Sequence, residues 1–381
     1  MIRFGPAASP PQVWAVEDTA VQVTWGNLPP GPVRARADDC MVSVEHRGGP
    51  GGLVIDGLPP DSPVSVELTW TGGRRKLAAK TLPSPPGELL ARFATVSDLH
   101  LGAERWGAMK TMVDQTDHPV PHPYRCAIAA VNEAVAWGAE LLVIKGDAAQ
   151  HECRADFAEV GRLVDEFPSL PMLLIPGNHD VDGRNGGTIP LTVGRRQLPY
   201  TRTVDSIDLP GARIVAADTA LPGQGRGSLT RTGAAVVDEI AGSDRPVFLA
   251  VHHQLQATRL PRHWPVGISA PASTDFLSRL DRLDVPITVS SGHTHRNRSR
   301  LHGDVLVTEV ASTKDWPGVW AGYAVHEGGI RQVVRRTADP DAIAWTEYSR
   351  GALNGLWAMW SPGPIGQRCI SRPWARRGSL V

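Results

Sequence analysis

Five short groups of polar residues, each placed directly after an apolar run, are the most informative feature of this 381-residue chain. In order they read Asp98-Leu99-His100, Gly146-Asp147, Gly177-Asn178-His179-Asp180, His252-His253 and Gly292-His293-Thr294-His295. Carboxylate, amide oxygen and imidazole suit divalent ions such as Mn, Fe and Zn. A carboxylate can bridge two such ions about 3.5–4 Å apart, and a hydroxide between them is a strong nucleophile at neutral pH. The set therefore predicts two adjacent divalent metal ions.

The elements that must position these groups follow from the apolar pattern. Five short apolar runs predict buried strands, and each run ends at one of the polar groups: 93–97, 141–145, 172–175, 247–251 and 287–290. Amphipathic segments between them predict helices, such as 123–138, which has proline near its start and glycine at its end. This alternation indicates an α/β domain, in which ligands gather beyond the carboxyl ends of strands. We therefore expect the five groups to converge.

The ordered set D-x-H, G-D, G-N-H-D, H and G-H-x-H resembles the calcineurin-like metallophosphoesterase superfamily over about residues 91–336. The resemblance implies a four-layer α/β/β/α sandwich and a dinuclear metal centre. By motif position it assigns the first metal to Asp98, His100 and His295, the bridge to Asp147, and the second metal to Asn178, His252 and His293. The identity of the two metals, Mn, Fe or Zn, stays open.

Four further residues receive roles outside the ligand set. The resemblance implies that His179 meets the phosphoryl oxygens or the leaving group, with Asp180 orienting its ring, as a carboxylate beside a histidine can. His253, the second of its pair, is expected either beside the ligands or at the rim, and is a candidate to contact the substrate. Arg296 follows a ligand directly and is the best candidate to bind the substrate phosphate, because guanidinium suits phosphate oxygens.

The resemblance implies in-line attack of a metal-bridging hydroxide on phosphorus. The D-x-H form with a His-His pair is similar to the class III cyclic nucleotide and glycerophosphodiester phosphodiesterase branch, which favours a small phosphodiester as substrate. A phosphomonoester is the alternative. A DNA nuclease ranks lower because the tail is short, and a non-catalytic metal-bound scaffold ranks lower because no ligand is missing. Gln150 stands where purple acid phosphatases carry tyrosine, which disfavours a tyrosinate-bound ferric site.

The chain outside the α/β region divides into two parts. Residues 1–86 alternate short apolar stretches with Gly/Pro-rich turns, typical of an all-β sandwich, and resemble a fibronectin type III domain around 58–68. The proline-rich stretch 83–87 predicts a linker. We expect the catalytic domain at 91–338. The tryptophan-rich segment 339–381 is expected to pack on it, with a lid or dimer contact as the alternative.

Composition and charge limit the kinds of partner and location that we expect for the chain. Lys and Arg together number 39, as do Asp and Glu, so the chain carries no net charge and a nucleic acid partner is not expected. The N-terminus lacks a signal-peptide core, and no apolar run approaches the ~20 residues of a membrane span. The four cysteines form no C-x-x-C pair. We expect a soluble cytoplasmic protein with a small phosphate-ester substrate, and its oligomeric state stays open.

Overall fold

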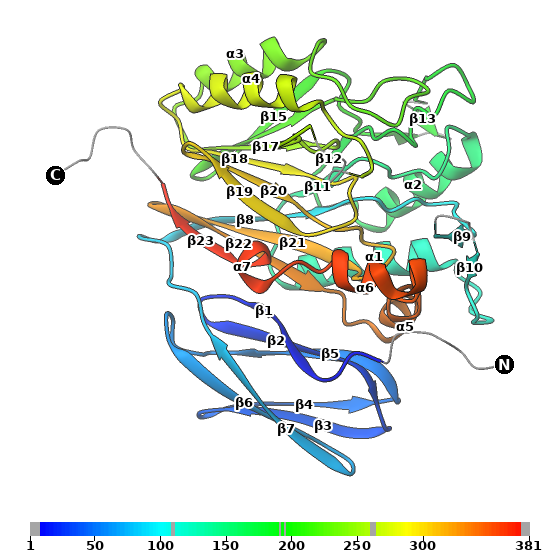
Figure 1. The fold of residues 1–381 in the computed structure, drawn as a ribbon, viewed down its shortest axis with the longest axis vertical. Helices are drawn as coiled ribbons and strands as arrows, with labels where there is room; N and C mark the ends of the chain where they lie inside the picture. Colours follow the sequence, from blue (N-terminus) through cyan, green and yellow to red (C-terminus); the bar gives the residue numbers. More distant parts are fainter. Residues whose placement is uncertain (1–7, 108–110, 190–191, 194–195, 260–263, 375–381) are drawn as a thin grey trace.

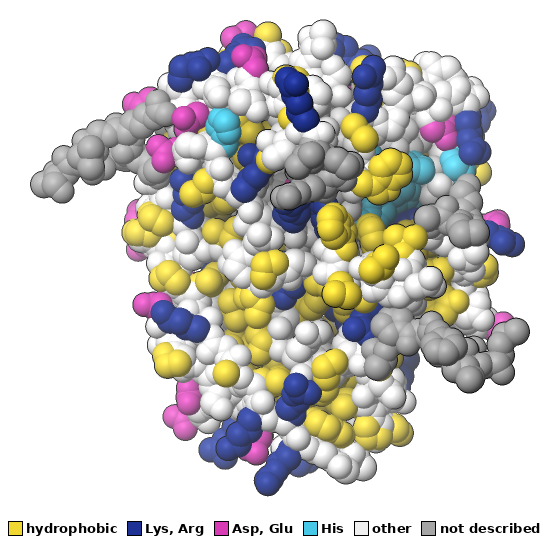
Figure 2. Space-filling model, in the orientation of Figure 1, with side chains coloured by type: hydrophobic (Ala, Val, Ile, Leu, Met, Phe, Trp, Pro, Cys, Tyr) yellow, Lys and Arg dark blue, Asp and Glu magenta, His cyan; other side chains and the backbone are white. Residues whose placement is uncertain are grey.

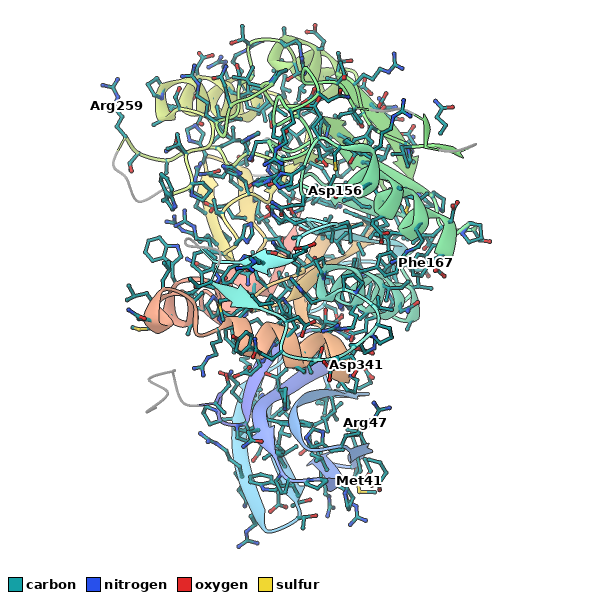
Figure 3. The ribbon with its side chains drawn as sticks, turned by 90° about the vertical axis from the view of Figure 1, so that its right-hand side faces the viewer. Met41, Arg47, Asp156, Phe167, Arg259 and Asp341 are labelled. Atoms are coloured by element: carbon teal, nitrogen blue, oxygen red, sulfur yellow. The ribbon has the colours of Figure 1, made fainter. Side chains whose placement is uncertain are left out.

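The computed structural model describes residues 8–107, 111–189, 192–193, 196–259 and 264–374. An N-terminal all-β region is followed by a mixed α/β sandwich (Figure 1). Figure 2 shows the surface in the same orientation, with several histidines reaching it beside hydrophobic side chains. In the view turned by 90°, Met41 and Arg47 mark the all-β region and Asp156 marks the α/β region (Figure 3).

The all-β region has seven strands in two antiparallel sheets. The smaller sheet has the order β1 (Gln12–Val16), β2 (Ala20–Leu28), β5 (Gly49–Asp56). The larger has the order β4 (Cys40–His46), β3 (Gly31–Ala37), β6 (Pro63–Trp70), β7 (Gly73–Lys80). Alternate residues of β3 are buried, as the two-residue period of a half-buried strand requires. Trp14 and Trp25 are buried in the core rather than exposed as a binding surface.

The α/β region contains two six-stranded sheets. The first has the order β12 (Met172–Ile175), β11 (Leu142–Lys145), β8 (Leu89–Val96), β21 (Val319–His326), β22 (Gly329–Arg336), β23 (Ile370–Pro373). The second has the order β15 (Val204–Leu209), β16 (Ala212–Ala217), β17 (Val247–Val251), β18 (Ile287–Ser291), β20 (Val305–Glu309), β19 (Arg298–His302). Strands β11, β12, β17 and β18 are buried throughout, as expected for parallel strands covered on both faces.

The two sheets pack face to face around aromatic side chains, and helices cover their outer faces. Between the sheets, the ring centroids of Phe93 and Phe248 lie 4.8 Å apart, and those of Phe248 and Tyr323 lie 4.6 Å apart. Separate apolar clusters lie under α1 (His122–Ala136) with α2 (Arg154–Glu166), and under α3 (Gly233–Ala241) with α4 (Ala270–Asp281). The predicted four-layer α/β/β/α sandwich is confirmed.

Short elements complete the described chain. Two small hairpins and four short helical segments lie in the connections: β9 (Arg105–Trp106), β10 (Met112–Val113), β13 (Thr192–Val193), β14 (Arg196–Gln197), α5 (Pro340–Ser349), η1 (Ala352–Gly355), α6 (Leu356–Trp360) and α7 (Ile365–Arg368). Residues 352–360 do not form a single helix, because Leu353 and Asn354 take left-handed backbone angles and divide the segment into η1 and α6.

Glu17 connects the all-β region to the α/β sandwich. Its buried carboxylate accepts hydrogen bonds from Arg331 Nη2 (2.9 Å), Arg335 Nε (2.9 Å) and Trp137 Nε1 (3.1 Å). Burial alone would raise the pKa of Glu17, but the two guanidinium groups outweigh it and lower the pKa. The side chain of Gln22 adds two hydrogen bonds to the backbone of Arg336 across the same interface. The two parts are therefore joined by buried polar contacts.

We expect Glu17→Gln to destabilise the protein by about 3 kcal/mol, because it removes the carboxylate paired with Arg335 and one of the two carboxylates paired with the buried Arg331. The pKa of Glu17 is lower in the folded protein than in the unfolded chain. Its stabilisation is therefore complete above the ordinary carboxyl pKa and is lost as the pH falls through the lowered value. Urea unfolding at pH 7 and at pH 4 measures both effects. Asp61→Asn, which removes only an exposed ion pair with Lys80, is the control and should change little.

Candidate metal centre

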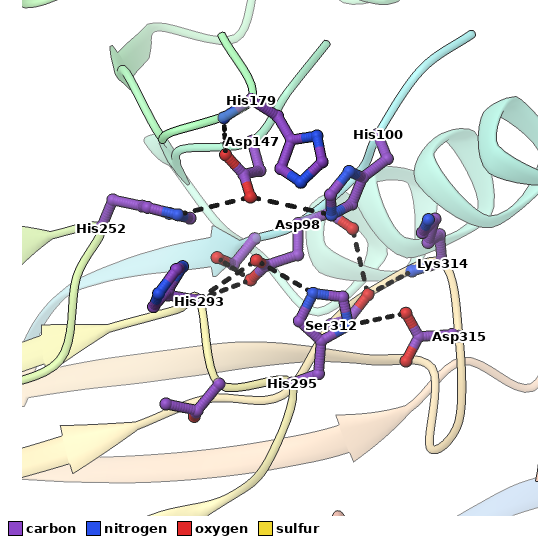
Figure 4. A network of polar contacts seen from close by, with 12 residues as sticks. Asp98, His100, Asp147, His179, His252, His293, His295, Ser312, Lys314 and Asp315 are labelled. Atoms are coloured by element: carbon purple, nitrogen blue, oxygen red, sulfur yellow. Dashed lines mark hydrogen bonds and ion pairs between the residues drawn. The ribbon is translucent and has the colours of Figure 1, made fainter. Parts of the chain in front are cut away.

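The five polar groups lie at the carboxyl ends of strands from both sheets. Strands β8, β11 and β12 of the first sheet and β17 and β18 of the second run parallel within each sheet, so their ends align. Backbone hydrogen bonds join the ends: Asp98 N–H donates to Gly146 O (3.0 Å), and Gly292 N–H donates to His252 O (3.0 Å). The predicted convergence on one site is present (Figure 4).

Asp98, His100 and His295 form one compact group, with ligand atoms within 4.8 Å of one another. His295 Nε2 lies 3.3 Å from Asp98 Oδ1. Neither ring nitrogen of the buried His100 has a hydrogen-bond partner among the described residues. Because a buried polar atom without a partner is costly, this imidazole fits a metal ligand. These are the residues assigned from the sequence to the first metal.

Asp147 lies between that group and the second set of ligands. Its Oδ2 is 3.8 Å from His100 Nε2 on one side and 3.4 Å from His252 Nε2 on the other. Asn178 Oδ1 lies 3.3 Å from the same His252 nitrogen. The buried carboxylate therefore faces candidate ligands of both metals, which is the position that a bridging ligand requires.

His293 and His253 complete the second side. The ligand nitrogens of His252, His253 and His293 lie within 4.8 Å of one another, and all three residues are buried. His253 Nδ1 is 2.9 Å from the hydroxyl oxygen of Thr219. His253 was expected either beside the ligands or at the rim, in contact with substrate. The structure buries it against His293, so it lies beside the candidate ligands and not at an exposed rim.

Hydrogen bonds from one ring nitrogen orient the histidines and leave the other nitrogen facing the carboxylates. His252 Nδ1 lies 2.7 Å from Lys145 O, so Nδ1 carries the proton and Nε2 faces Asp147. His295 Nδ1 lies 2.8 Å from Asp315 Oδ2, and its Nε2 faces Asp98. This fixing of the tautomer by an outer partner is the usual arrangement of metal-binding histidine.

Backbone strain is concentrated at the same residues. Five candidate ligands have φ between 47° and 68°: Asp98, His100, Asp147, His293 and His295. Non-glycine residues seldom adopt this region, and such strain gathers where function over-determines the backbone. At Gly292, a Cβ atom would meet Ser97 Oγ and Asp98 Oδ2, so only glycine allows this close approach. The motif glycine therefore belongs to the packing of the centre.

Charge in the centre is shared between histidines and carboxylates. Burial alone would lower the pKa of His295, but Asp315 and Asp98 outweigh it and raise the pKa to about 10. In the same way, burial opposes charge on His252, yet Asp147 raises its pKa to about 9. Burial would raise the pKa of Asp147, and the surrounding histidines hold it well below the usual value. The carboxylates therefore favour positive charge at the positions of His252 and His295, and the same carboxylates would favour bound cations.

Two neighbouring residues, Lys314 and Asp315, were missed from the sequence. Asp315 holds His295, and burial lowers the pKa of Lys314, beside His100, to about 8 (Figure 4). Both lie a few residues after β20, beyond Ser312 and Thr313. The available signal was a polar group shortly after a buried strand, which resembles the signal of the other five groups.

We expect Asp315→Asn to lower kcat/KM by about 10–100-fold, the usual cost of losing an outer partner of a metal-binding histidine. The amide keeps the shape but supplies no negative charge to orient and polarise His295. Steady-state kinetics with metal titration measures the effect, and excess metal should restore part of the activity. Asp304→Asn, in the exposed turn after β19, is the matched control and should behave as wild type.

The surroundings of His179 and Asp180 differ from the expectation. His179 Nδ1 lies 2.9 Å from the carbonyl oxygen of Gln150, so this backbone group, and not Asp180, orients the ring. The Asp180 carboxylate turns to the backbone instead, accepting from Gly177 N–H (2.8 Å) and Ala149 N–H (2.8 Å). These two backbone N–H groups lie outside the strands, so no neighbouring strand supplies an acceptor and the carboxylate does. Asp180 therefore fixes the loops that carry Asp147 and Asn178.

Arg296 is also placed differently from the expectation. Its side chain is buried, Nε lies 3.1 Å from Glu309 Oε2, and its guanidinium lies 5.0 Å from the ring of Trp360. A buried guanidinium is paired in this way to offset its desolvation. Arg296 therefore belongs to the packing beneath the site, and the structure does not place it to bind a substrate phosphate.

The donor set fits divalent transition metals. It offers carboxylates from Asp98 and Asp147, the amide oxygen of Asn178 and several imidazoles, a mixture that suits Mn, Fe or Zn. The unpartnered nitrogens of His100 and the position of Asp147 between two groups agree with a dinuclear site.

Within the described residues, no helix is both long and apolar enough to cross a membrane.

Comparison with known proteins agrees with this geometry. The model of the calcineurin-like phosphoesterase family matches residues 91–297, more than half of the chain. No curated protein matched the chain. Similar solved structures include a purple acid phosphatase from yellow lupin (Lupinus luteus) seeds, with 12% identity over 86% of this chain and 72% of that one (TM-score 0.46). Another is a dimetal phosphatase from Danio rerio, with 12% identity over 76% of this chain and 100% of that one (TM-score 0.49). From the family match, the chain belongs to the calcineurin-like phosphoesterases, and it is a dimetal phosphoesterase of that superfamily.

Proposed function

We propose that this protein hydrolyses a small phosphodiester, of the cyclic nucleotide or glycerophosphodiester type. The observation that carries the proposal is the buried carboxylate of Asp147, within 4 Å of a candidate ligand of each metal. Two divalent cations held by these residues would lower the pKa of water and polarise the phosphoryl group. The alternative substrate is a phosphomonoester.

His179 supplies the second part of the proposal. Its backbone N–H donates to Asp147 Oδ1 (2.8 Å), and its ring lies against that of His100, with centroids 4.6 Å apart. The Gln150 carbonyl fixes the proton on Nδ1, so Nε2 is the nitrogen available to the reacting group. In its protonated form the ring would donate a hydrogen bond to the phosphoryl oxygens or a proton to the leaving oxygen.

The preference for a diester rests on the resemblance of two motifs. His100 in D-x-H and the His252-His253 pair are shared with the class III phosphodiesterase branch. Arg296, the guanidinium closest in sequence to a ligand, is paired with Glu309. It therefore does not add a cation for the second negative charge that a monoester carries. Both points favour a substrate with one negative charge on phosphorus.

The test compares two substrates with the same leaving group. With added Mn, we expect bis(p-nitrophenyl) phosphate to be hydrolysed with a kcat/KM at least about tenfold above that of p-nitrophenyl phosphate. The reverse order would make the monoester alternative correct. If neither ester is hydrolysed by protein that holds two metals per chain, the assignment of an active phosphoesterase is wrong.

A further inference from the structure

Exposed apolar side chains flank the metal centre on two sides. We call this set the apolar rim: Trp264, Val266, Leu356, Met359 and Trp360. Met359 and Trp264 are the most exposed, at 84% and 74%. Figure 2 shows hydrophobic side chains gathered around the histidines that reach the surface. Isolated exposed apolar residues are ordinary, but a group of them around a polar site marks a binding surface.

The first side of the rim is attached to the ligand His295. The ring of Trp357 lies 6.2 Å from that of His295 in an edge arrangement, and Trp357 Nε1 donates to Trp316 O (3.1 Å). The Ser361 hydroxyl donates to the His295 carbonyl, and Ser361 O accepts from Asn297 N–H (2.8 Å). Helix α6 is therefore fixed to the G-H-x-H loop at both ends, and it carries Leu356, Met359 and Trp360 outward from there.

The second side of the rim is attached to the ligand His293. The carbonyl oxygen of Val266 lies 3.3 Å from His293 Nε2. The carbonyl of Pro265 accepts from the side chain of Gln254, two residues after His252 (2.7 Å). Trp264 and Val266 thus extend from a segment fixed to the second-metal residues. Two segments far apart in the sequence both place apolar side chains beside the same centre.

The turn that leads into α6 is strained. Leu353 and Asn354 are consecutive residues with φ of 51° and 54°, and the Leu353 side chain is exposed. A leucine in the left-handed region raises the free energy of the folded state. Because the side chain of Leu353 is exposed, burial does not offset this cost. The strained turn sets the start of α6, so it also sets where Leu356 and Met359 lie.

We propose that the apolar rim binds an apolar organic group of the phosphoester substrate while the phosphorus lies at the metal centre. This inference rests on the proposed function and narrows its substrate class to esters with an apolar substituent. None of the five rim side chains is charged, so the rim offers contact area rather than ion pairs. The rim is joined to His293 through the carbonyl of Val266, and to His295 through Trp357 and Ser361, which adjoin the rim residues of α6. This proximity to candidate ligands of both metals favours a group joined to the reacting phosphate over a separate partner.

The experiment compares methyl p-nitrophenyl phosphate with hexyl p-nitrophenyl phosphate, which share the leaving group and differ only in the retained alkyl chain. We expect kcat/KM to be at least about tenfold higher for the hexyl ester, as for several methylenes contacting an apolar surface. The double variant Leu356→Ser, Met359→Ser should bring this ratio close to one. Met41→Ser, an exposed methionine in the all-β region (Figure 3), should keep the wild-type ratio.

Several results would overturn the inference. Equal kcat/KM for the two esters in wild type overturns it and leaves the proposed function intact, whereas no hydrolysis of either ester overturns both. If the double variant loses metal, Trp264→Ser on the opposite side gives the second measurement, and an unchanged ratio there contradicts the proposal. Binding to phosphatidylcholine vesicles that the double variant abolishes, with equal rates for both esters, would instead identify a lipid-surface contact.

Discussion

Asp147→Asn should reduce kcat/KM by at least about a thousandfold. The carboxylate lies within 4 Å of ring nitrogens of His100 and His252, which are candidate ligands of the two proposed metals. An amide offers one oxygen and no charge, so it cannot replace a bridging carboxylate. Metal ions contribute several kcal/mol of transition-state stabilisation, and about 1.4 kcal/mol corresponds to a factor of ten in rate.

The same variant should hold fewer metal ions than wild type, which elemental analysis measures. Asp208→Asn is the control, because that carboxylate makes an exposed ion pair with Arg213 away from the centre. It should retain both metals and full activity. If Asp147→Asn keeps two metals per chain and more than a tenth of the activity, the role of Asp147 as the shared ligand is contradicted.

His179→Ala should lower kcat by about 10²–10⁴-fold while the metal content stays that of wild type. The His179 ring is held by the Gln150 carbonyl and contacts the ring of His100. A ring nitrogen of His179 also lies within 4.8 Å of ligand atoms of His100 and Asp147, so the metal content of the variant must be measured with its activity. A group that protonates the leaving oxygen matters most when that oxygen leaves poorly. The loss should therefore be larger for an alkyl leaving group than for p-nitrophenolate.

The control for this variant is His118→Ala, an exposed histidine whose Nδ1 accepts from the Val120 N–H of its own loop. It should be fully active. Two outcomes distinguish the role of His179 from a structural one. Equal losses with good and poor leaving groups would exclude proton donation, and loss of a metal ion would show that His179 is itself a ligand.

Much of the centre could be predicted because one local signal repeats. A buried strand is a short apolar run, and the polar residue that ends it lies at the sheet edge where the strand ends meet. Strand β17 and the His252-His253 pair show this, since the predicted range 247–251 is the observed one. The candidate ligands were named from the sequence, and the structure brings them together.

The remainder could not be predicted for physical reasons. The partner of the His179 ring is a backbone carbonyl, at Gln150, and a carbonyl has no side-chain signature. The resemblance assigned Asp180 to the ring of His179, but the carboxylate turns to the amides of Gly177 and Ala149 instead. Strand β23 pairs with β22 across a long separation in sequence, which local patterns do not encode. The domain limits 1–86, 91–338 and 339–381 stay predictions.

The most direct test of the account is the metal content of the purified protein after saturation with Mn and removal of unbound ions. We predict two metal ions per chain by elemental analysis, and one or none in Asp147→Asn. A protein that binds no metal under these conditions, or that hydrolyses phosphoesters equally well after complete chelation, would contradict a dinuclear centre built on Asp147.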